Sequence, residues 1–298
     1  MALDKDQIAA RLQALQQSIC TAIEAEDGGA KFSSELWQRP GGGGGDTRVI
    51  ENGKVIEKGG VNFSAVYGEL PTKISAALGV DSNAFFATGV SIVMHPANPH
   101  VPIIHMNVRY FELDNGKYWF GGGIDLTPHY VVKDQCDWFH QQLMQACLPT
   151  SPDYYNRFSK WANEYFFIKH RGESRGVSGI FFDLLIEQSE GMSKEELFEF
   201  EMRVGESFAP IYTHLMQLNK DKPYTELNKA WQMHRRSRYV EFNLVYDKGT
   251  KFGLDTDGRI DSILMSLPPE TGWKYTQEWP EGGDELKTEK ILQTQFVP

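Results

Sequence analysis

Three runs rich in β-branched and aromatic residues follow one another closely, and this series constrains the fold more than any other feature. The runs span residues 85–95, 102–113 and 118–126, and the turn residues 114–116 separate the last two. Such runs bounded by turn residues are typical of strands. Because side chains alternate along a strand, Asn107 and Arg109 are predicted to share one face with Phe111, and Val108 lies on the other.

Helical patterns occur before and after these runs. The first helix has apolar residues at spacings of three and four and ends at Gly28 and Gly29; the apolar residues are Ile8, Leu12, Leu15, Ile19 and Ile23. Further helices are predicted over 134–147, from Ser151 onward, and after the capping box formed by Ser193 and Glu196. The third of these carries its apolar stripe on Leu197, Phe200, Val204, Phe208, Ile211 and Leu215.

Strands are predicted on both sides of this helical block. Asn52-Gly53 indicates a hairpin, the five glycines at 41–45 indicate a loop, and the runs 239–247 and 262–268 are predicted to be strands. The chain shows no regular βα alternation, no internal repeat and no linker-like tract. We therefore expect one α+β domain over 1–298, with a large, mostly antiparallel β-sheet flanked by helices on both faces.

Composition excludes several classes of protein. The formal net charge of −10 argues against a broad nucleic-acid surface. Three cysteines with no CxxC pair exclude a disulfide framework and a thiolate zinc site. No run approaches the roughly 18 consecutive apolar residues of a membrane span. With no Arg/Ser-rich presequence at the start of the sequence, a cytoplasmic location is expected.

Cofactor and nucleophile motifs are also missing. The five-glycine run lacks the Lys-Ser/Thr of a phosphate-binding loop, and neither GxGxxG nor HExxH occurs. GESRG at 172–176 has the letters of a nucleophile elbow, but an aromatic helix leads into it instead of a strand. These absences argue against a nicotinamide, a flavin or a nucleotide as cofactor.

Two groups of residues suggest chemistry without deciding it. His95, His100 and His105 fall within eleven residues, and His140 and His170 follow downstream. Each fits a hydrogen-bonded structural histidine, and together they fit a metal site or a proton shuttle. Three glycines at 121–123 fit either a bulge or the close approach of a bulky group to the backbone, and Asp125 then faces either a ligand or a turn amide.

Arginines are clustered in the same way. HRGESR contains Arg171 and Arg175, and HRRSR contains Arg235, Arg236 and Arg238. Each cluster fits a solvated charged face or an anion site within this acidic chain.

Several long motifs together resemble the aerobic coproporphyrinogen III oxidases. The motifs are GVSIVMHPANPHVPIIHMNVRYFEL, WFGGGIDLTP, YFFIKHRGESRGVSGIFFD and SRYVEFNLVYDKGTKFGL. The similarity runs from the first helix to residue 269. It implies a homodimer with a large antiparallel sheet between helices. It also implies that the protein converts two propionates of coproporphyrinogen III to vinyl groups, giving protoporphyrinogen IX in haem synthesis, with O2 as co-substrate.

The resemblance also implies roles for individual residues. The catalytic positions that it implies are His105, Asp125 and Asp247. The substrate-binding positions are Ser91, Asn107, Val108, Arg109, Arg171, Arg175, Asp257, Gly258 and Arg259. Four histidines match positions described as ligands of a divalent metal: His95, His105, His140 and His170. Residues 239–266 match the dimer contact. The sequence departs from the family at Asp257, where members often have glycine, and this weakens the assignment of that loop.

The implied chemistry suits these residue types. Arginine binds carboxylates through a planar fork that stays charged, for which Arg109, Arg175 and Arg259 are candidates. Asp125 or Asp247 would accept hydrogen bonds from pyrrole N–H groups, and His105 would act as acid or base. An electron-rich pyrrole can donate electrons to O2 directly, so no redox cofactor is required. Two rivals stay open: a histidine-liganded metalloenzyme, and a tetrapyrrole carrier without catalytic activity.

Overall fold

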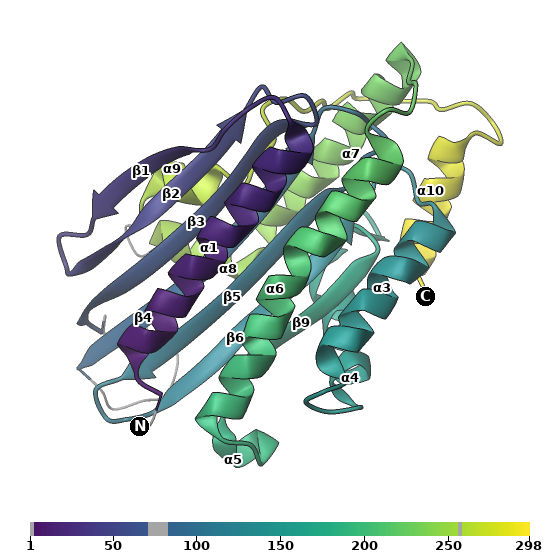
Figure 1. Ribbon diagram of the computed structural model, residues 1–298. Helices are drawn as coiled ribbons and strands as arrows, with labels where there is room; N and C mark the ends of the chain where they lie inside the picture. Colours follow the sequence, from purple (N-terminus) through teal and green to yellow (C-terminus); the bar gives the residue numbers. More distant parts are fainter. Residues whose placement is uncertain (1–2, 71–82, 256–257) are drawn as a thin grey trace.

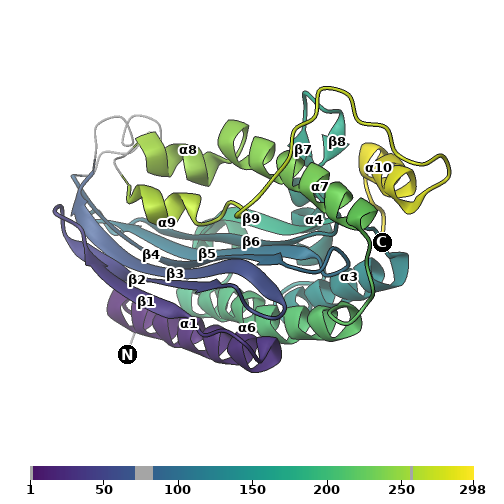
Figure 2. The same cartoon turned by 90° about the horizontal axis from the view of Figure 1, so that it is seen from above.

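The computed structural model describes residues 3–70, 83–255 and 258–298, and these form a seven-stranded sheet with helices on both faces (Figures 1 and 2). The strand order is β1-β2-β3-β4-β5-β6-β9, and every neighbouring pair is antiparallel. The strands are β1 (Ser33–Gln38), β2 (Gly43–Glu51), β3 (Ile56–Glu69), β4 (Ala84–Pro96), β5 (Ile103–Leu113), β6 (Tyr118–Thr127) and β9 (Ser178–Leu185). A separate two-stranded hairpin consists of β7 (Phe167–Ile168) and β8 (Glu173–Ser174).

The helices form two layers, one on each side of the sheet. Figure 2 shows α1, α3 and α6 along one face and α7, α8 and α9 along the other. The helix bounds are α1 (Lys5–Asp27), α3 (Lys133–Cys147), α4 (Tyr154–Tyr165), α5 (Glu187–Glu190), α6 (Lys194–Asn219), α7 (Glu226–Val245), α8 (Lys248–Asp255), α9 (Ile260–Leu264) and α10 (Asp284–Thr294). The predicted α+β class and the two-sided cover are confirmed. None of the described helices is long and apolar enough to cross a membrane.

The two sheet faces differ in character. On β5, Ile104, Met106 and Val108 are fully buried in the main core, on the face covered by α1 and α6. From His105 to Phe111 the alternate residues, including Asn107 and Arg109, are only half-buried. The predicted alternation of β5 is therefore confirmed. We call the second face, which α7, α8 and α9 overlie, the open face.

A buried carboxylate joins the first helix to the first long hairpin. A capping box of Asp4 and Gln7 starts α1, and Gly28, with φ +62°, ends it. Asp27 is 2% exposed and accepts N–H bonds from Ala30 and from three residues of the hairpin segment, Lys54, Val55 and Ile56. The five predicted apolar positions of α1 are all buried. Asn52, with φ +57°, turns the predicted hairpin between β2 and β3.

Two predicted strands do not form, because the first lies mostly in a helix and the second in a helix end and the turn after it. Residues 239–245 belong to α7, and residues 262–268 contain the end of α9. The β-branched and aromatic letters of 239–247 favour a strand locally. However, the capping box of Thr225 and Asn228 starts α7 well upstream. The buried residues Trp231, Arg235 and Tyr239 then recur every four positions. Packing of this helical face therefore outweighs the local preference for a strand.

Other differences are smaller. Only part of the five-glycine run forms a turn, because Gly43 onward belongs to β2 and pairs with β3. Strand β9 was not predicted, and it forms the edge of the sheet beside β6. The helix expected from Ser151 begins at Tyr154. The capping box of Ser193 and Glu196 and all six predicted apolar positions of α6 are confirmed.

Candidate active site

Polar and small side chains from neighbouring strands meet on the open face. Register places Asn107 between Ser91 of β4 and Gly123 of β6. Arg109 lies between Gly89 and Gly121 in the same way. Because partners across an antiparallel pair share a face, these residues form a floor of polar groups and glycines. Three of the predicted substrate-binding positions, Ser91, Asn107 and Arg109, are thus brought together.

Val108 is the exception among the predicted substrate contacts. Its side chain is fully buried in the core on the opposite face of β5. The resemblance assigned the whole segment 107–109, but a strand turns every second side chain away. A contact between Val108 and a substrate on the open face would therefore have to come from its backbone.

Arg109 is oriented yet still accessible. Its Nη1 donates to Asn107 Oδ1 at 2.9 Å, and its Nη2 lies 2.9 Å from Asp183 Oδ1. The side chain keeps 37% of its surface exposed. A Cβ at Gly121 would lie 2.5 Å from Asp183 Oδ1 and 2.9 Å from Arg109 Nη2, so glycine leaves the room that this ion pair occupies. A register shift between Phe120 and Gly122 also confirms the bulge interpretation of the glycine run.

Asp125 holds His105 in one tautomer. His105 Nδ1 lies 2.7 Å from Asp125 Oδ1, and the two residues face each other across β5 and β6. Burial alone would raise the pKa of Asp125, but the Arg175 charge and the hydrogen bonds with His105 and Arg175 hold it below its ordinary value. An ionised carboxylate can only accept, so Nδ1 carries the proton. In neutral His105 the Nε2 atom is then the free base, on a side chain that is 24% exposed.

Arg175 supports Asp125 from within the protein. Its Nη2 donates to Asp125 Oδ2, and its Nη1 donates to Asn243 Oδ1 at 3.1 Å. The rings of Phe166, Tyr239 and Phe242 surround the guanidinium at 4.3, 4.8 and 4.7 Å. Arg175 is only 2% exposed. It is therefore placed to position Asp125, whereas the sequence suggested a direct contact with substrate.

Asp247 lies beside this network and caps α8. It accepts a hydrogen bond from Tyr165 Oη at 2.9 Å and from the Thr250 N–H at 2.7 Å. The carboxylate is half-buried, and its charge is among the influences that raise the pKa of Arg175 against the effect of burial. Tyr165 and Asn243 belong to the same surroundings, and no sequence motif indicated either of them.

The segment around α9 covers the other end of the open face. Arg259 is the N-cap residue of α9 and forms an ion pair with Glu35 of β1. Gly258 is half-buried and donates its N–H to Gly253 O at 2.9 Å. Asp257 lies outside the described residues. Arg259 thus stands over β1, several strands away from Arg109 on β5.

Asn62 is a site residue that the sequence did not indicate. It pairs with Ser91 across β3 and β4, and its Nδ2 donates to Ser262 O of α9 at 2.7 Å. Its buried Oδ1 has no partner in the described structure. Alternation along β3 could have found it, but only after the register with Ser91 was known.

Arg171 and His170 belong to a different cluster, centred on Glu241 of α7. Arg171 binds both carboxylate oxygens of Glu241, at 2.8 and 2.6 Å, and His170 Nε2 lies 2.7 Å from Oε2. Burial would raise the pKa of Glu241, but the hydrogen bonds from Arg171, Trp273 and His170 lower it to about 2. These two residues are not brought together with Arg109 and His105.

The second arginine cluster is neither a solvated face nor a free anion site. Arg235 is fully buried and binds Glu173 at 3.0 Å, and Arg238 binds the same carboxylate at 3.1 Å. Arg236 forms an ion pair with Glu57. These contacts fasten α7 to the β8 hairpin and to β3.

The four histidines implied as metal ligands have separate partners. His95 Nε2 lies 2.8 Å from Ser266 O, and burial lowers the pKa of His95 to about 3. On α3, His140 contacts Val177 O at 3.0 Å and Tyr155 Oη at 2.9 Å. His105 and His170 bind the carboxylates named above. Within the part of the chain that the structure describes, no three His, Cys, Asp or Glu side chains are grouped to hold a metal ion.

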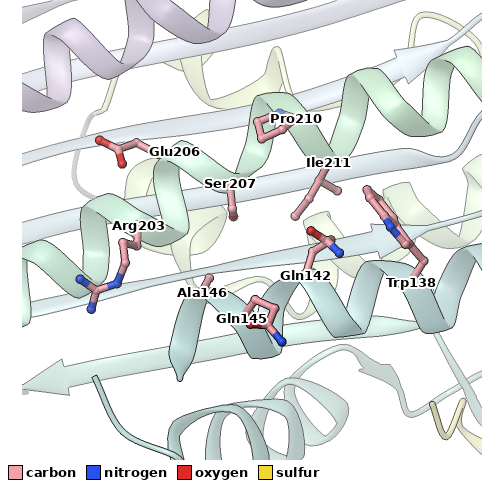
Figure 3. A pocket seen from close by; sticks show the side chains of 9 residues that line it. All are labelled: Trp138, Gln142, Gln145, Ala146, Arg203, Glu206, Ser207, Pro210 and Ile211. Atoms are coloured by element: carbon pink, nitrogen blue, oxygen red, sulfur yellow. The ribbon is translucent and has the colours of Figure 1, made fainter. Parts of the chain in front are cut away.

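A pocket on the face of the sheet covered by α1, α3 and α6 contains none of the predicted site residues. It lies between α3 and α6 (Figure 3), and its lining residues are Trp138, Gln142, Gln145, Ala146, Arg203, Glu206, Ser207, Pro210 and Ile211. Because α3 and α6 lie on the side of the sheet opposite α7, α8 and α9 (Figure 2), this pocket is not on the open face. The acid–base pair and the accessible Arg109 both lie on the open face, which is therefore the better candidate.

Comparison with known proteins agrees with the motifs. The family model described as coproporphyrinogen III oxidase matches residues 7–296. The chain is 48% identical over 287 residues to an oxygen-dependent coproporphyrinogen-III oxidase, chloroplastic, of Glycine max, covering 91% of this chain and 74% of that protein. It is 48% identical over 291 residues to coproporphyrinogen-III oxidase 1, chloroplastic, of Arabidopsis thaliana, covering 93% of this chain and 74% of that protein. With a match of this length, the chain belongs to the coproporphyrinogen III oxidase family.

Proposed function

We propose that this protein is an oxygen-dependent coproporphyrinogen III oxidase. It converts two propionates of coproporphyrinogen III to vinyl groups and yields protoporphyrinogen IX for haem synthesis. The relatives named above support the reaction. The single structural observation that carries it is the His105–Asp125 pair, four residues along β5 from the accessible Arg109.

The reaction balances with O2 as the only oxidant. Each propionate loses CO2 and a hydrogen from its side-chain carbon, which leaves a vinyl group and releases two electrons. O2 takes up the two electrons and two protons as hydrogen peroxide. One of these protons comes from the side-chain carbon and the other from solvent. The site must therefore hold a carboxylate near a base without hydrating it.

Arg109 and His105 supply these two requirements. In this proposal Arg109 anchors the carboxylate of a propionate through its planar fork. His105 Nε2 accepts the proton from the side-chain carbon, since its Nδ1 is bound to Asp125. Asp125 acts through His105, because one of its oxygens binds His105 and the other binds Arg175. The ionised carboxylate stabilises the imidazolium that forms.

Asn62 and Asp247 are the candidate acceptors for pyrrole N–H groups. Asn62 Oδ1 is an acceptor beside Ser91 that has no hydrogen-bond partner among the residues that the structure describes. Asp247 is half-buried and keeps acceptor capacity beyond its bonds to Tyr165 and Thr250. Hydrogen bonds to these acceptors would make the pyrrole more electron-rich and favour electron transfer to O2.

No redox cofactor or metal is required for turnover, and a divalent metal would have a structural or inhibitory role. The single domain of 1–298 forms a homodimer through residues 239–266, supported by the exposed apolar side chains of Leu244, Val245, Leu254 and Ile260. The location is cytoplasmic, which fractionation of the native host would test, since the named relatives are chloroplastic.

The test supplies freshly reduced coproporphyrinogen III to purified protein, with and without O2. Chromatography of the products should show protoporphyrinogen IX only when O2 is present. Tetrapyrrole binding without conversion in oxygenated buffer would favour the carrier instead. A heat-inactivated sample controls for spontaneous oxidation, which forms coproporphyrin and not the vinyl product.

A further inference from the structure

An aromatic row crosses the open face beyond Arg109. Phe85 of β4 and Phe111 of β5 stack with ring centroids 5.6 Å apart and planes at 7°. Phe111 and Trp119 of β6 stack at 4.5 Å and 19°. All three side chains are half-buried. We call Phe85, Phe111 and Trp119 the aromatic row.

Arg39 stands at the β4 end of this row. Its guanidinium carbon lies 5.6 Å from the centroid of the Phe85 ring, and its Nη1 donates to Tyr67 O at 3.2 Å. Arg39 is half-buried, and none of the ion pairs in the described residues involves it. By contrast, Arg109 pairs with Asp183 and Arg259 pairs with Glu35. Arg39 is thus a cation on this side of the sheet that lacks a described carboxylate partner.

The row continues the candidate active site along the strands. Phe111 follows Arg109 by two residues on the same face of β5, about 7 Å further along at roughly 3.3 Å per residue. His105 lies six residues from Phe111, about 20 Å away by the same rise. Register places Trp119 opposite Phe111 and Gly121 opposite Arg109. The face therefore presents, in order, an acid–base pair, an accessible arginine and a row of rings bordered by a second arginine.

We propose that Arg39 and the aromatic row form a second subsite, which binds a pyrrole ring of the substrate together with a propionate that does not react. This inference rests on the proposed function, because that substrate carries four propionates and only two are converted. A half-buried guanidinium that forms no ion pair within the described residues fits a carboxylate. Flat aromatic surface beside it fits a pyrrole ring. Binding at this distance from His105 would orient the reacting ring without taking part in the chemistry.

The test measures binding without turnover. The probes are deuteroporphyrin IX, which keeps only the two propionates that do not react, and its dimethyl ester, which has no charge there. Both are titrated anaerobically against wild type, Arg39→Gln and Arg39→Lys by absorbance. Arg39→Gln should weaken binding of the diacid roughly 10- to 100-fold, the range of one charge-assisted contact, and leave the ester within about twofold. Arg39→Lys should recover part of the diacid affinity.

Control variants separate this role from general stability. Arg11→Gln removes an arginine that also stacks on a phenylalanine, Phe198 at 4.8 Å, but on α1 at the opposite face. It should change neither affinity. Trp119→Leu should weaken the diacid and the ester by the same factor of about 2–10, because stacking does not depend on the charge of the carboxylate.

Two results would overturn the subsite. One is an equal loss of diacid and ester affinity in Arg39→Gln, which a purely structural role produces. The other is diacid affinity unchanged in both Arg39 variants. Either outcome is distinct from failure of the proposed function, which would appear as absence of vinyl product from the wild type in oxygenated buffer.

Discussion

Arg109 is the residue whose environment most directly suggests contact with a carboxylate. Asn107 and Asp183 fix its guanidinium at 2.9 Å each, yet 37% of the side chain stays exposed. Arg109→Leu should lower kcat/KM roughly 30- to 1000-fold, the effect of losing about 2–4 kcal/mol of charge-assisted binding. Arg109→Lys should be rescued only in part, because an ammonium cannot reproduce the fork. A folded Arg109→Leu enzyme with full kcat/KM would remove Arg109 from the site.

Asp125 is predicted to act on the rate more than on binding. Asp125→Asn removes the charge that stabilises the His105 imidazolium and keeps the size of the side chain. We expect kcat to fall about 10²- to 10⁴-fold, with a much smaller change in KM. Steady-state kinetics on coproporphyrinogen III would measure both. Asp247→Asn removes the charge of the second aspartate in the same way and should be compared with Asp125→Asn. Its amide oxygen can still accept the hydrogen bond from the Thr250 N–H, so the start of α8 is preserved. A loss confined to KM in Asp125→Asn would contradict the assigned role.

Among the helices and strands, those with clear local signals in the sequence were predicted correctly. Apolar spacing and capping boxes located α1 and α6, and turn residues located the hairpin and strands β4 to β6. Residues 239–247 were misassigned because the packing of α7 on the sheet outweighs the strand propensity of their β-branched and aromatic side chains. The polar row on β5 was predictable from alternation. Its partners Asn62 and Asp183 were not, because register and the edge position of β9 are tertiary facts.

Asp27 offers a test of how α1 is joined to the sheet. Burial would raise the pKa of this carboxyl, but the N–H bonds from Ala30, Ile56, Val55 and Lys54 lower it. A lowered folded pKa means that this stabilisation is present above the unfolded value near 4 and is lost as pH falls through the folded value. Asp27→Ala should lower the free energy of unfolding at pH 7 by about 2–4 kcal/mol.

Denaturant unfolding of both proteins between about pH 3 and pH 7 would measure this effect. The difference between wild type and Asp27→Ala should shrink toward the acid end, because only the wild type loses the ionised carboxylate there. A difference that is constant across this range would show that the charge of Asp27 does not contribute.

At the scale of the molecule, the end of α7 and the helices after it present exposed apolar side chains. Leu244 and Val245 are 47% and 48% exposed, and Ile260 is 60% exposed. The proposed wild-type dimer should have twice the 33.9 kDa mass of one chain. The Leu244→Asp variant should have a mass closer to that of the monomer. Light scattering at micromolar concentration would follow this change. Leu227→Asp is the matched control, because Leu227 is 42% exposed on the same helix but outside 239–266. A monomeric wild type would exclude the proposed interface.

On the proposed function, the open face oxidises and decarboxylates the substrate with O2 alone. The most direct measurement uses one chelator-treated sample, in which metal content, O2 uptake, CO2 release and vinyl product are all quantified. Turnover should be unchanged in metal-depleted protein, with two O2 consumed and two CO2 released for each protoporphyrinogen IX. Activity that disappears with the metal, and returns in proportion to the ion added back, would instead identify the protein as a metalloenzyme.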